Sequence, residues 1–184
     1  MARPTFSDVR SLTDFTTTYD WNLEITKSPN KVTGVDGTKL NLRCMSTNIP
    51  KKTISPLQAR IRGLPPVNQP GPAIPDQSLT VVFYSTNDCY ILRSIISDWN
   101  EQVYDSNTGV AQRKLDVEAS VRLVLQNRQH QDIMAYNLIG VWLQDNDNGQ
   151  LQNAEGDLMQ VTLTLRYDTF TIENITSDIS NSST

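Results

Sequence analysis

The stretch from residue 79 to residue 104 most constrains how this chain can fold. A run of β-favouring residues at 79–84 is followed by a short turn and then by apolar residues at helical spacing. The large apolar residues at positions i, i+3, i+4, i+7 and i+11 are Leu92, Ile95, Ile96, Trp99 and Val103. No other segment shows this period convincingly. We therefore expect a β protein with one amphipathic helix that docks on a sheet through Leu92, Ile95, Ile96 and Trp99.

Alternating apolar and polar residues predict the strands of this protein. The expected strands lie at 19–27, 40–47, 79–84, 116–126, 133–143 and 158–167, with a further possible strand at 53–62. The first two are separated by turn residues and are expected to form a hairpin. The polar segment 127–132 suits the tip of a second hairpin, between 116–126 and 133–143.

The length of 184 residues suits one domain with appended segments. We expect an N-terminal arm at 1–18, a β domain at 19–170 and a flexible, Ser-rich C-terminal tail at 171–184. Inside the domain, the segment 63–76 is rich in proline and predicts an extended loop. Such a loop is either a surface excursion or an extension that reaches a neighbouring subunit.

The composition excludes several functional classes. The formal net charge of −4 leaves no broad basic surface for nucleic acid, and no polybasic segment indicates membrane binding. No apolar run approaches the ~18–20 residues that span a bilayer. The hydrophobic share of 38% is below the roughly 45–50% of soluble domains. This low share favours a protein that draws part of its stability from neighbouring subunits.

The residues that usually carry chemistry are sparse. The single histidine, His130, lies in the polar segment 127–132, where a histidine is usually solvated. Cys44 and Cys89 are expected to be buried free thiols rather than a disulfide framework. The acidic turn 145–149 departs from a calcium loop because Gln144 would occupy its first ligand position. We therefore expect no enzyme activity, no cofactor and no metal.

The order of the predicted elements and several short motifs resemble the tail tube protein of contractile-tailed bacteriophages, within a superfamily that includes the type VI secretion tube. The matching segments are 22–25, the Cys-bearing strand and Ile-Pro pair at 42–50, the strand–helix unit at 79–99, the glycine–aromatic strand end at 137–142, and 158–167. The resemblance spans residues 19–170. The chain departs from the family in the proline-rich segment 63–76 and in its Ser-rich C terminus.

The resemblance implies a β-sandwich or barrel-like subunit with one flanking helix, which assembles into a hexameric ring. Sheets of neighbouring subunits would join into one continuous barrel around a channel. Stacked rings would form the tube of a virion tail, made in the host cytoplasm, with sheath, baseplate and tail terminator proteins as partners. DNA would pass through without specific binding, and an acidic channel would repel its phosphates.

The strands 116–126 and 133–143 are the best candidates for lining this channel. In the first strand, the apolar phase is expected to face the core; it comprises Val117, Ala119, Val121, Leu123 and Leu125. Side chains alternate across a strand, so the other phase is predicted to face the channel; it comprises Glu118, Ser120, Arg122 and Gln126. On a monomer, the same residues would simply face solvent.

Two other functional classes remain open at this stage. One is a monomeric β-sandwich module for binding or adhesion, and the other is an enzyme. Binding modules often carry clusters of surface aromatic residues, whereas Trp21, Trp99 and Trp142 each lie in phase with apolar neighbours and are expected in the core. The missing site chemistry argues against an enzyme. A tube subunit is therefore favoured, and a baseplate-end ring, a tailocin tube and a secretion tube remain variants of it.

Overall fold

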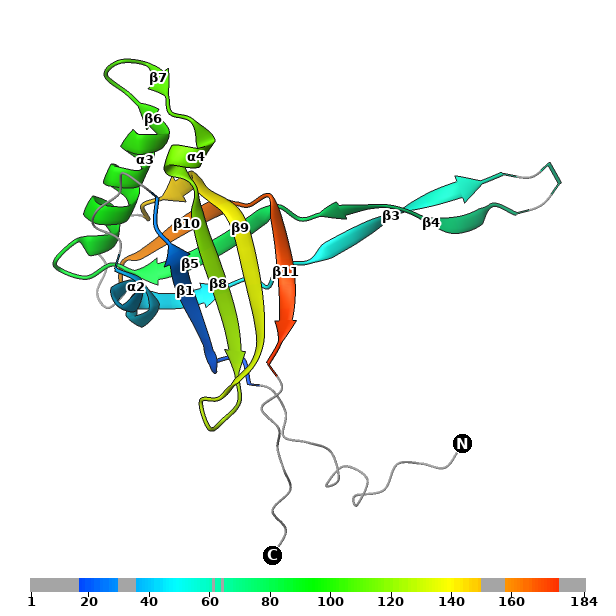
Figure 1. Cartoon of the computed structure of the whole chain (residues 1–184), viewed down its shortest axis with the longest axis horizontal. Helices are drawn as coiled ribbons and strands as arrows, with labels where there is room; N and C mark the ends of the chain where they lie inside the picture. The colour runs from blue at the N-terminus through cyan, green and yellow to red at the C-terminus, as the bar shows by residue number, and fades with distance from the viewer. Residues whose placement is uncertain (1–16, 30–35, 61, 64, 150–157, 176–184) are drawn as a thin grey trace, which may run out of the picture.

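The computed structural model describes residues 17–29, 36–60, 62–63, 65–149 and 158–175, and the statements below concern these residues. The fold is mainly β (Figure 1). Its main sheet is antiparallel and has seven strands in the order β1-β8-β9-β10-β5-β2, with β11 also paired to β9. The fold class expected from the sequence, a β subunit with a flanking helix, is confirmed.

The elements have the following bounds. The main sheet comprises β1 (Trp21–Lys27), β2 (Cys44–Thr47), β5 (Ser78–Tyr84), β8 (Ala119–Gln126), β9 (Asp132–Asp147), β10 (Gln160–Arg166) and β11 (Thr169–Asn174). Two separate hairpins comprise β3 (Lys52–Ala59) with β4 (Val67–Pro75), and β6 (Tyr104–Asp105) with β7 (Val110–Ala111). The helical elements are α2 (Gly37–Arg43), the π-helix η1 (Ile91–Ser97), which continues into α3 (Asp98–Val103), and α4 (Lys114–Val117).

The long strand β9 divides the main sheet into two parts. Its first half pairs with β8 and β11, and its second half pairs with β10. Gly140, at a φ of 70°, lies where the partner changes. Ile139 is still opposite Thr169 of β11, whereas Leu143 is opposite Leu165 of β10. The part β1-β8-β9-β11 therefore crosses the part β9-β10-β5-β2, as Figure 1 shows.

The core is completed by the helix formed by η1 and α3. Trp99 is 1% exposed, and its indole N–H donates to the carbonyl of Val117 at 2.9 Å. Ile95 and Ile96 are buried as well, whereas Leu92 is half-buried and Ile91 is 1% exposed. A π-helix has more residues per turn than an α-helix, so the apolar stripe here shifts toward Ile91. No helix in the described part of the chain is long and apolar enough to cross a bilayer.

The expected hairpin between 19–27 and 40–47 is wrong. Residues Gly37–Arg43 form helix α2, because Asp36 caps it by accepting hydrogen bonds from the N–H groups of Thr38 and Lys39. In a run this short, two apolar residues at alternate positions fit either a strand or a helix. Here Leu40 is buried and Leu42 is exposed. Strand β1 pairs with β8, and β2 pairs with β5.

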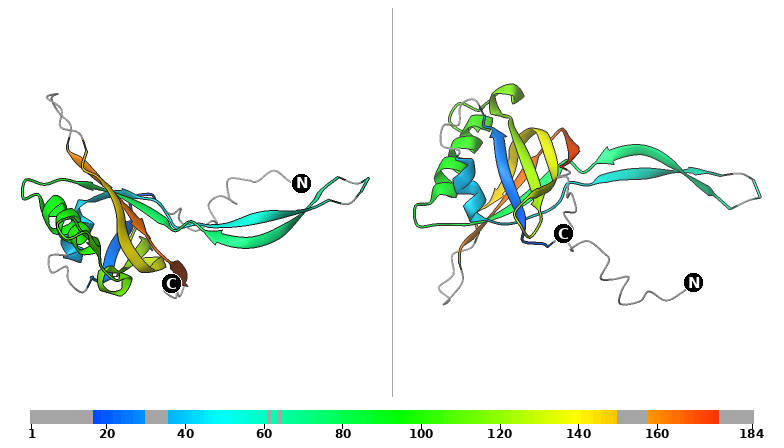
Figure 2. Two further views of the ribbon diagram at one scale, coloured as in Figure 1. Left: turned by 90° about the horizontal axis from the view of Figure 1, so that it is seen from above. Right: turned by 60° about the horizontal axis from the view of Figure 1, so that its bottom comes forward.

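The prediction of an extended loop at 63–76 is also wrong, because most of this segment forms strand β4. This strand pairs with β3, which lies within the expected strand 53–62 except for its first residue. The two form a long ribbon that projects from the body of the protein (Figure 2). Proline lacks an N–H group, and a two-stranded ribbon tolerates it because each strand keeps one unpaired edge. Pro56 and Pro70 lie opposite each other, next to a register shift.

The ends of the chain only partly match expectation. The predicted arm, apart from Thr17 and Thr18, lies outside the described residues, as does the end of the predicted tail at 176–184. The start of that tail is not flexible, because β11 extends to Asn174 and pairs with β9. The strand expected at 116–126 begins only at Ala119, after helix α4.

Candidate functional site

The candidate site is one face of the sheet part β1-β8-β9-β11, which we call the polar face. The four strands lie in straight register there. One row consists of Glu24, Arg122, Asn137 and Thr171, each opposite the next. The neighbouring row consists of Asn22, Val124, Ala135 and Glu173. The opposite face of these strands packs on the core.

Arg122 is the centre of the polar face. Its guanidinium lies 3.4 Å from the Glu24 carboxylate on β1 and 3.6 Å from the Glu173 carboxylate on β11. The Asn137 side chain donates to the same Glu173 carboxylate at 3.2 Å. Partly exposed ion pairs of this kind contribute only about 0–1 kcal/mol each. Their main consequence is that the charge of Arg122 is neutralised from both sides.

The four residues predicted to line a channel lie at different points of this region, and all are half-buried. Ser120 and Arg122 lie on the polar face. Gln126, at the end of β8, donates to the Asp132 carboxylate at 2.9 Å. Glu118 lies just before β8 and forms an ion pair with Lys27 at 3.5 Å.

Other residues of the polar face were missed from the sequence. Glu24 and Glu173 come from strands whose proximity to β8 depends on long-range pairing, which strand phase alone does not give. Val124 belongs to the polar phase of β8 but is 0% exposed, as is Ala135 opposite it, and both lie outside the main core cluster. Their neighbours on this face include Arg122 and Glu173, whose aliphatic stems can cover them.

Strands β1 and β11 form the two outer edges of this sheet part. Each of the pairs β1–β8, β8–β9 and β9–β11 is antiparallel, so β1 and β11 run in opposite directions. Helix α2 covers part of the β1 edge: the Asn41 side chain accepts from the N–H of Leu23 at 3.1 Å and donates to the Asn22 side chain at 3.0 Å. Gly37 lies against Ile25 farther along. Residues Tyr19–Trp21 of the edge lie beyond these hydrogen bonds.

A groove of about 320 Å³ opens beside that end of β1, and we call it the β1 groove. Its described lining residues are all uncharged and include Tyr19, Trp21, Asn41, Leu42, Cys44 and Met45. Leu42 is 81% exposed and Tyr19 72%. Burial raises the pKa of the Cys44 thiol to about 12. The groove is therefore an uncharged surface of mixed polar and apolar side chains in an acidic protein.

The β3–β4 hairpin is a second surface with an unusual composition. Among the described strands, β3 and β4 pair only with each other. Ile54, Leu57 and Val67 are each more than half exposed. Residues 51–76 contain four cations, Lys51, Lys52, Arg60 and Arg62, against the single acid Asp76. The net charge of this segment is +3, so the remainder of the chain carries −7.

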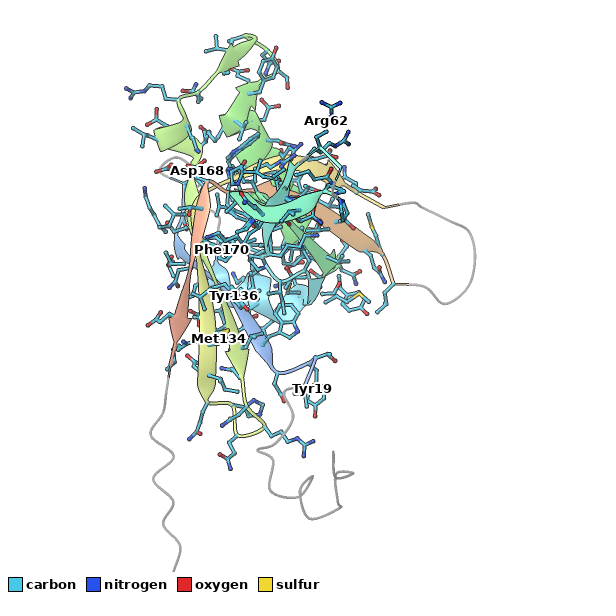
Figure 3. All side chains as sticks on the ribbon, turned by 90° about the vertical axis from the view of Figure 1, so that its right-hand side faces the viewer. Tyr19, Arg62, Met134, Tyr136, Asp168 and Phe170 are labelled. Atoms are coloured by element: carbon cyan, nitrogen blue, oxygen red, sulfur yellow. The ribbon has the colours of Figure 1, made fainter. Side chains whose placement is uncertain are left out.

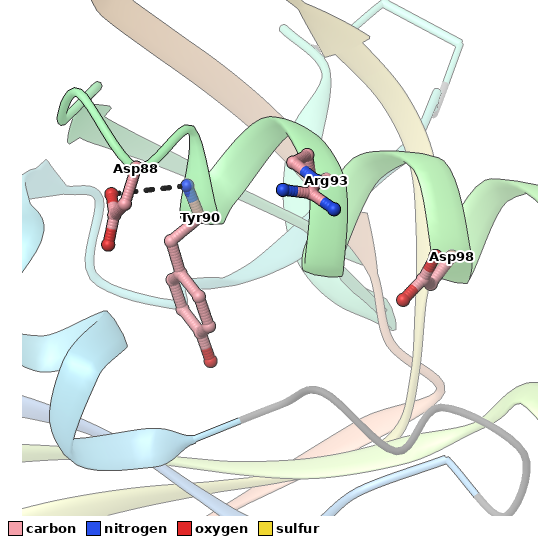
Figure 4. A pocket seen from close by; sticks show the side chains of 4 residues that line it. All are labelled: Asp88, Tyr90, Arg93 and Asp98. Carbon is pink, nitrogen blue, oxygen red and sulfur yellow. Dashed lines mark hydrogen bonds between the residues drawn. The ribbon is translucent and has the colours of Figure 1, made fainter.

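A hollow of about 310 Å³ lies at the start of the helix, lined by Asp88, Tyr90, Arg93 and Asp98 (Figure 4). The Asp88 carboxylate accepts hydrogen bonds from Thr86 and from the Tyr90 N–H and pairs with Arg43 at 2.9 Å. The hydrogen bond from Thr86, with help from the Arg43 charge, lowers the pKa of Asp88. These contacts fasten α2 to the start of the helix. No group of three or more metal-ligating side chains occurs in the described ranges.

No protein-family model and no curated protein sequence matches this chain. Several solved structures match its fold. A chain in the cryo-EM structure of the anti-feeding prophage tube-terminating cap matches with a TM-score of 0.65 at 12% identity, over 89% of this chain and 94% of that one. A chain in the sheath–tube complex of the extracellular contractile injection system PVC matches with a TM-score of 0.61 at 11% identity, over 94% and 100%.

A third match lies in the anti-feeding prophage baseplate, with a TM-score of 0.63 at 13% identity, over 89% of this chain and 99% of that one. At such low identity, these matches establish a shared fold. The chain has the fold of the tube-type proteins of contractile injection systems, in agreement with the resemblance read from its sequence.

Proposed function

We propose that this chain is a structural, non-enzymatic subunit that assembles with copies of itself into hexameric rings, and that these rings stack into the tube of a contractile tail. The observation that carries the proposal is the antiparallel relation of β1 and β11. Because three antiparallel pairings connect β1 to β11 and leave them running in opposite directions, β11 of one copy can continue the antiparallel order at β1 of the next. A head-to-tail contact of this kind closes into a ring when the rotation between copies allows it.

In such a ring, the polar face lines the channel, with Glu118, Ser120, Arg122 and Gln126 on its wall. DNA passes along this wall without specific binding. The pairing of Arg122 with Glu24 and Glu173, and of Lys27 with Glu118, supports this role, because phosphates would meet no unpaired cation among these side chains. Three carboxylates against two cations also leave this set net negative, which favours repulsion of phosphates.

The β3–β4 hairpin extends to a neighbouring copy. An isolated two-stranded hairpin is at best marginally stable in water, and this one has exposed apolar side chains. Its net charge of +3 against −7 for the remainder of the chain supports docking on the acidic body of another copy. Pro56, Pro70 and Pro72 remove backbone donors, so the hairpin docks through side chains rather than by adding strands.

The subunit belongs to the tail of a virion or of a related particle, such as a tailocin or a secretion tube, and is made in the host cytoplasm. Its partners are the sheath, baseplate and tail terminator proteins. Structural similarity to chains of a tube complex, a cap and a baseplate supports this set of partners. The position in the particle, as main tube subunit or as an end ring, follows from which neighbours it binds.

Electron microscopy of the purified protein tests the proposal. We expect rings or tubes with six-fold symmetry, and light scattering masses well above the 20.7 kDa monomer. A strict monomer at high concentration, without rings in micrographs, would contradict the proposal and favour a monomeric binding or adhesion module. A map of the assembly tests the channel separately. If Glu118, Ser120 and Arg122 lie on its outer surface or between subunits, the channel assignment is wrong.

A further inference from the structure

We infer that the β1 groove is the site that receives Ile172 of a second copy of this chain, and that this contact fixes how far neighbouring sheets are offset. The inference rests on the proposed assembly into rings. It adds a specific side-chain contact, on one named face of the sheet, to the general pairing of β1 with β11.

Ile172 is an apolar side chain at the open edge of the sheet. It is 55% exposed and lies opposite Tyr136. Phe170, two residues earlier on the same face, packs against the core and has its ring 6.3 Å from that of Tyr136. Figure 3 shows Tyr136 and Phe170 close together along β9 and β11. Ile172 therefore continues a packed apolar strip to the edge, where an adjoining subunit can cover it.

The β1 groove offers matching chemistry at the opposite edge. Leu42 and Met45 are exposed apolar side chains on its wall, whereas Trp21 packs against the core of its own subunit. Trp21 and Ile172 belong to the core-side faces of their strands, since Leu23 and Phe170, two residues away in each case, pack on the core. The groove and Ile172 therefore lie on the same side of the sheet, at its two ends.

The register of the sheet determines which residue of β11 reaches the groove. Leu23, Leu123, Tyr136 and Ile172 form one straight row across the four strands. Without an offset between copies, Ile172 would therefore lie level with Leu23, where Asn41 of α2 occupies the edge. A closed barrel requires an offset because its strands are tilted, and only an even number of residues keeps each face in place.

An offset of two residues toward the start of β1 brings Ile172 level with Trp21. That direction places Asn174 level with Tyr19, beyond the Leu23 N–H that Asn41 occupies, and leaves Phe170 level with Leu23. It also places the Ile172 side chain beside the β1 groove. The same step in the other direction would place Ile172 level with Ile25, against Gly37 of α2. The structure therefore favours the offset that fills the groove.

Cysteine cross-linking tests this contact in the assembled protein. The test variant combines Leu42→Cys and Ile172→Cys with Cys89→Ser, which removes the exposed natural thiol. Cys44 is retained, since a thiol with a pKa of about 12 reacts slowly near neutral pH. After mild oxidation or treatment with a short bismaleimide, we expect a ladder of covalent oligomers up to the size of the ring on a denaturing gel.

The matched control combines Leu42→Cys with Val110→Cys in the same background. Val110 is 53% exposed, on the β6–β7 hairpin, and we expect no ladder from it. Rings in micrographs without a Leu42→Cys/Ile172→Cys ladder would overturn the inference and leave the proposed function intact. Absence of rings from the unmodified protein would instead overturn the proposed function.

Ile172→Asp provides a second measurement: we expect a monomer with an unchanged circular dichroism spectrum, and normal assembly of this variant would overturn the inference.

Discussion

Gly140 lies so close to Asp168 that a Cβ atom at position 140 would overlap the Asp168 carboxylate. The two residues belong to the bend of β9 and to the turn between β10 and β11. The backbone N–H of Asp168 donates to the carbonyl of Ile139 at 3.0 Å, and its side chain forms an ion pair with Lys114. This contact fixes the point at which the two parts of the sheet separate, and with it the position of the β11 edge.

Gly140→Ala should lower the free energy of unfolding by more than Gly109→Ala does, although both glycines have a positive φ. A non-glycine residue at a φ of 70° costs on the order of 1–3 kcal/mol, and displacement of the Asp168 carboxylate adds to this cost. Chemical denaturation of Gly140→Ala and Gly109→Ala measures the difference between their free energies of unfolding. Gly109 has a φ of 69°, but a Cβ there would meet only the Tyr104 hydroxyl at 3.7 Å. Equal losses in the two variants would show that the contact with Asp168 has no energetic role.

Trp99→Ala should lower the free energy of unfolding by about 3–5 kcal/mol, because the ring is 1% exposed and the cavity would lie between helix and sheet. Trp99→Phe keeps most of the apolar packing but leaves the Val117 carbonyl without its indole donor. We expect that variant to lose about 1–3 kcal/mol. Denaturant titration followed by circular dichroism measures both. A loss under about 1 kcal/mol for Trp99→Ala would show that the ring adds little to the core.

The parts of the fold that were predictable are those in which one face of an element is buried. Val81, Val121 and Leu163 are each in an alternating run, and each is buried in its strand. The helix was predictable for the same reason, although its π-helical start exchanges Leu92 for Ile91 as a core residue. Periodicity thus identifies which side of an element is covered, whatever covers it.

Apart from the hairpin of β8 and β9, which are neighbours in the chain, pairing partners were not predictable, because they depend on residues far apart in the chain. Residue Glu24 reaches Arg122 only through the pairing of β1 with β8, and Glu173 reaches it only because β11 lies beside β9. Strand β4 was not predicted because its prolines indicate a loop. A two-stranded ribbon tolerates them, since each strand keeps one unpaired edge. Helix α2 was not predicted because it is short and Leu40 is its single buried residue. The candidate site was therefore predicted on β8 without its partners Glu24 and Glu173.

The charge of the β3–β4 hairpin should influence assembly. Replacement of Arg60 and Arg62 by Glu changes the charge of residues 51–76 from +3 to −1. If the hairpin docks on an acidic neighbour, sedimentation velocity should show a smaller assembled fraction, and assembly of the unmodified protein should weaken as salt screens the contact. Arg113→Glu is the control, since this exposed cation lies in the body of the subunit. Equal effects of hairpin and control substitutions would contradict specific docking.

Cys44 should make stability depend on alkaline pH. Burial raises the pKa of its thiol from 9.0 to about 12 in the folded protein, so the unfolded chain releases this proton first. The contribution of Cys44 is fully present below pH 9 and is lost as the pH rises toward 12. The slope should be about 1.4 kcal/mol per pH unit for one proton. Cys44→Ala should show a shallower decline in denaturation experiments between pH 9 and 11, whereas parallel curves would contradict the assignment.

Asn41 should restrain assembly, because its side chain occupies the N–H of Leu23 on the edge where copies are proposed to join. Asn41→Ala exposes this donor. We expect a loss of about 0.5–1.5 kcal/mol in the stability of the subunit, together with faster assembly in light scattering. Asn48→Ala is the matched control, because the Asn48 side chain accepts from the N–H of Thr80 at 2.5 Å, on β5 rather than β1. It should lose similar stability without gaining assembly rate. If a folded Asn41→Ala variant assembles no faster than the unmodified protein, α2 does not limit access to β1.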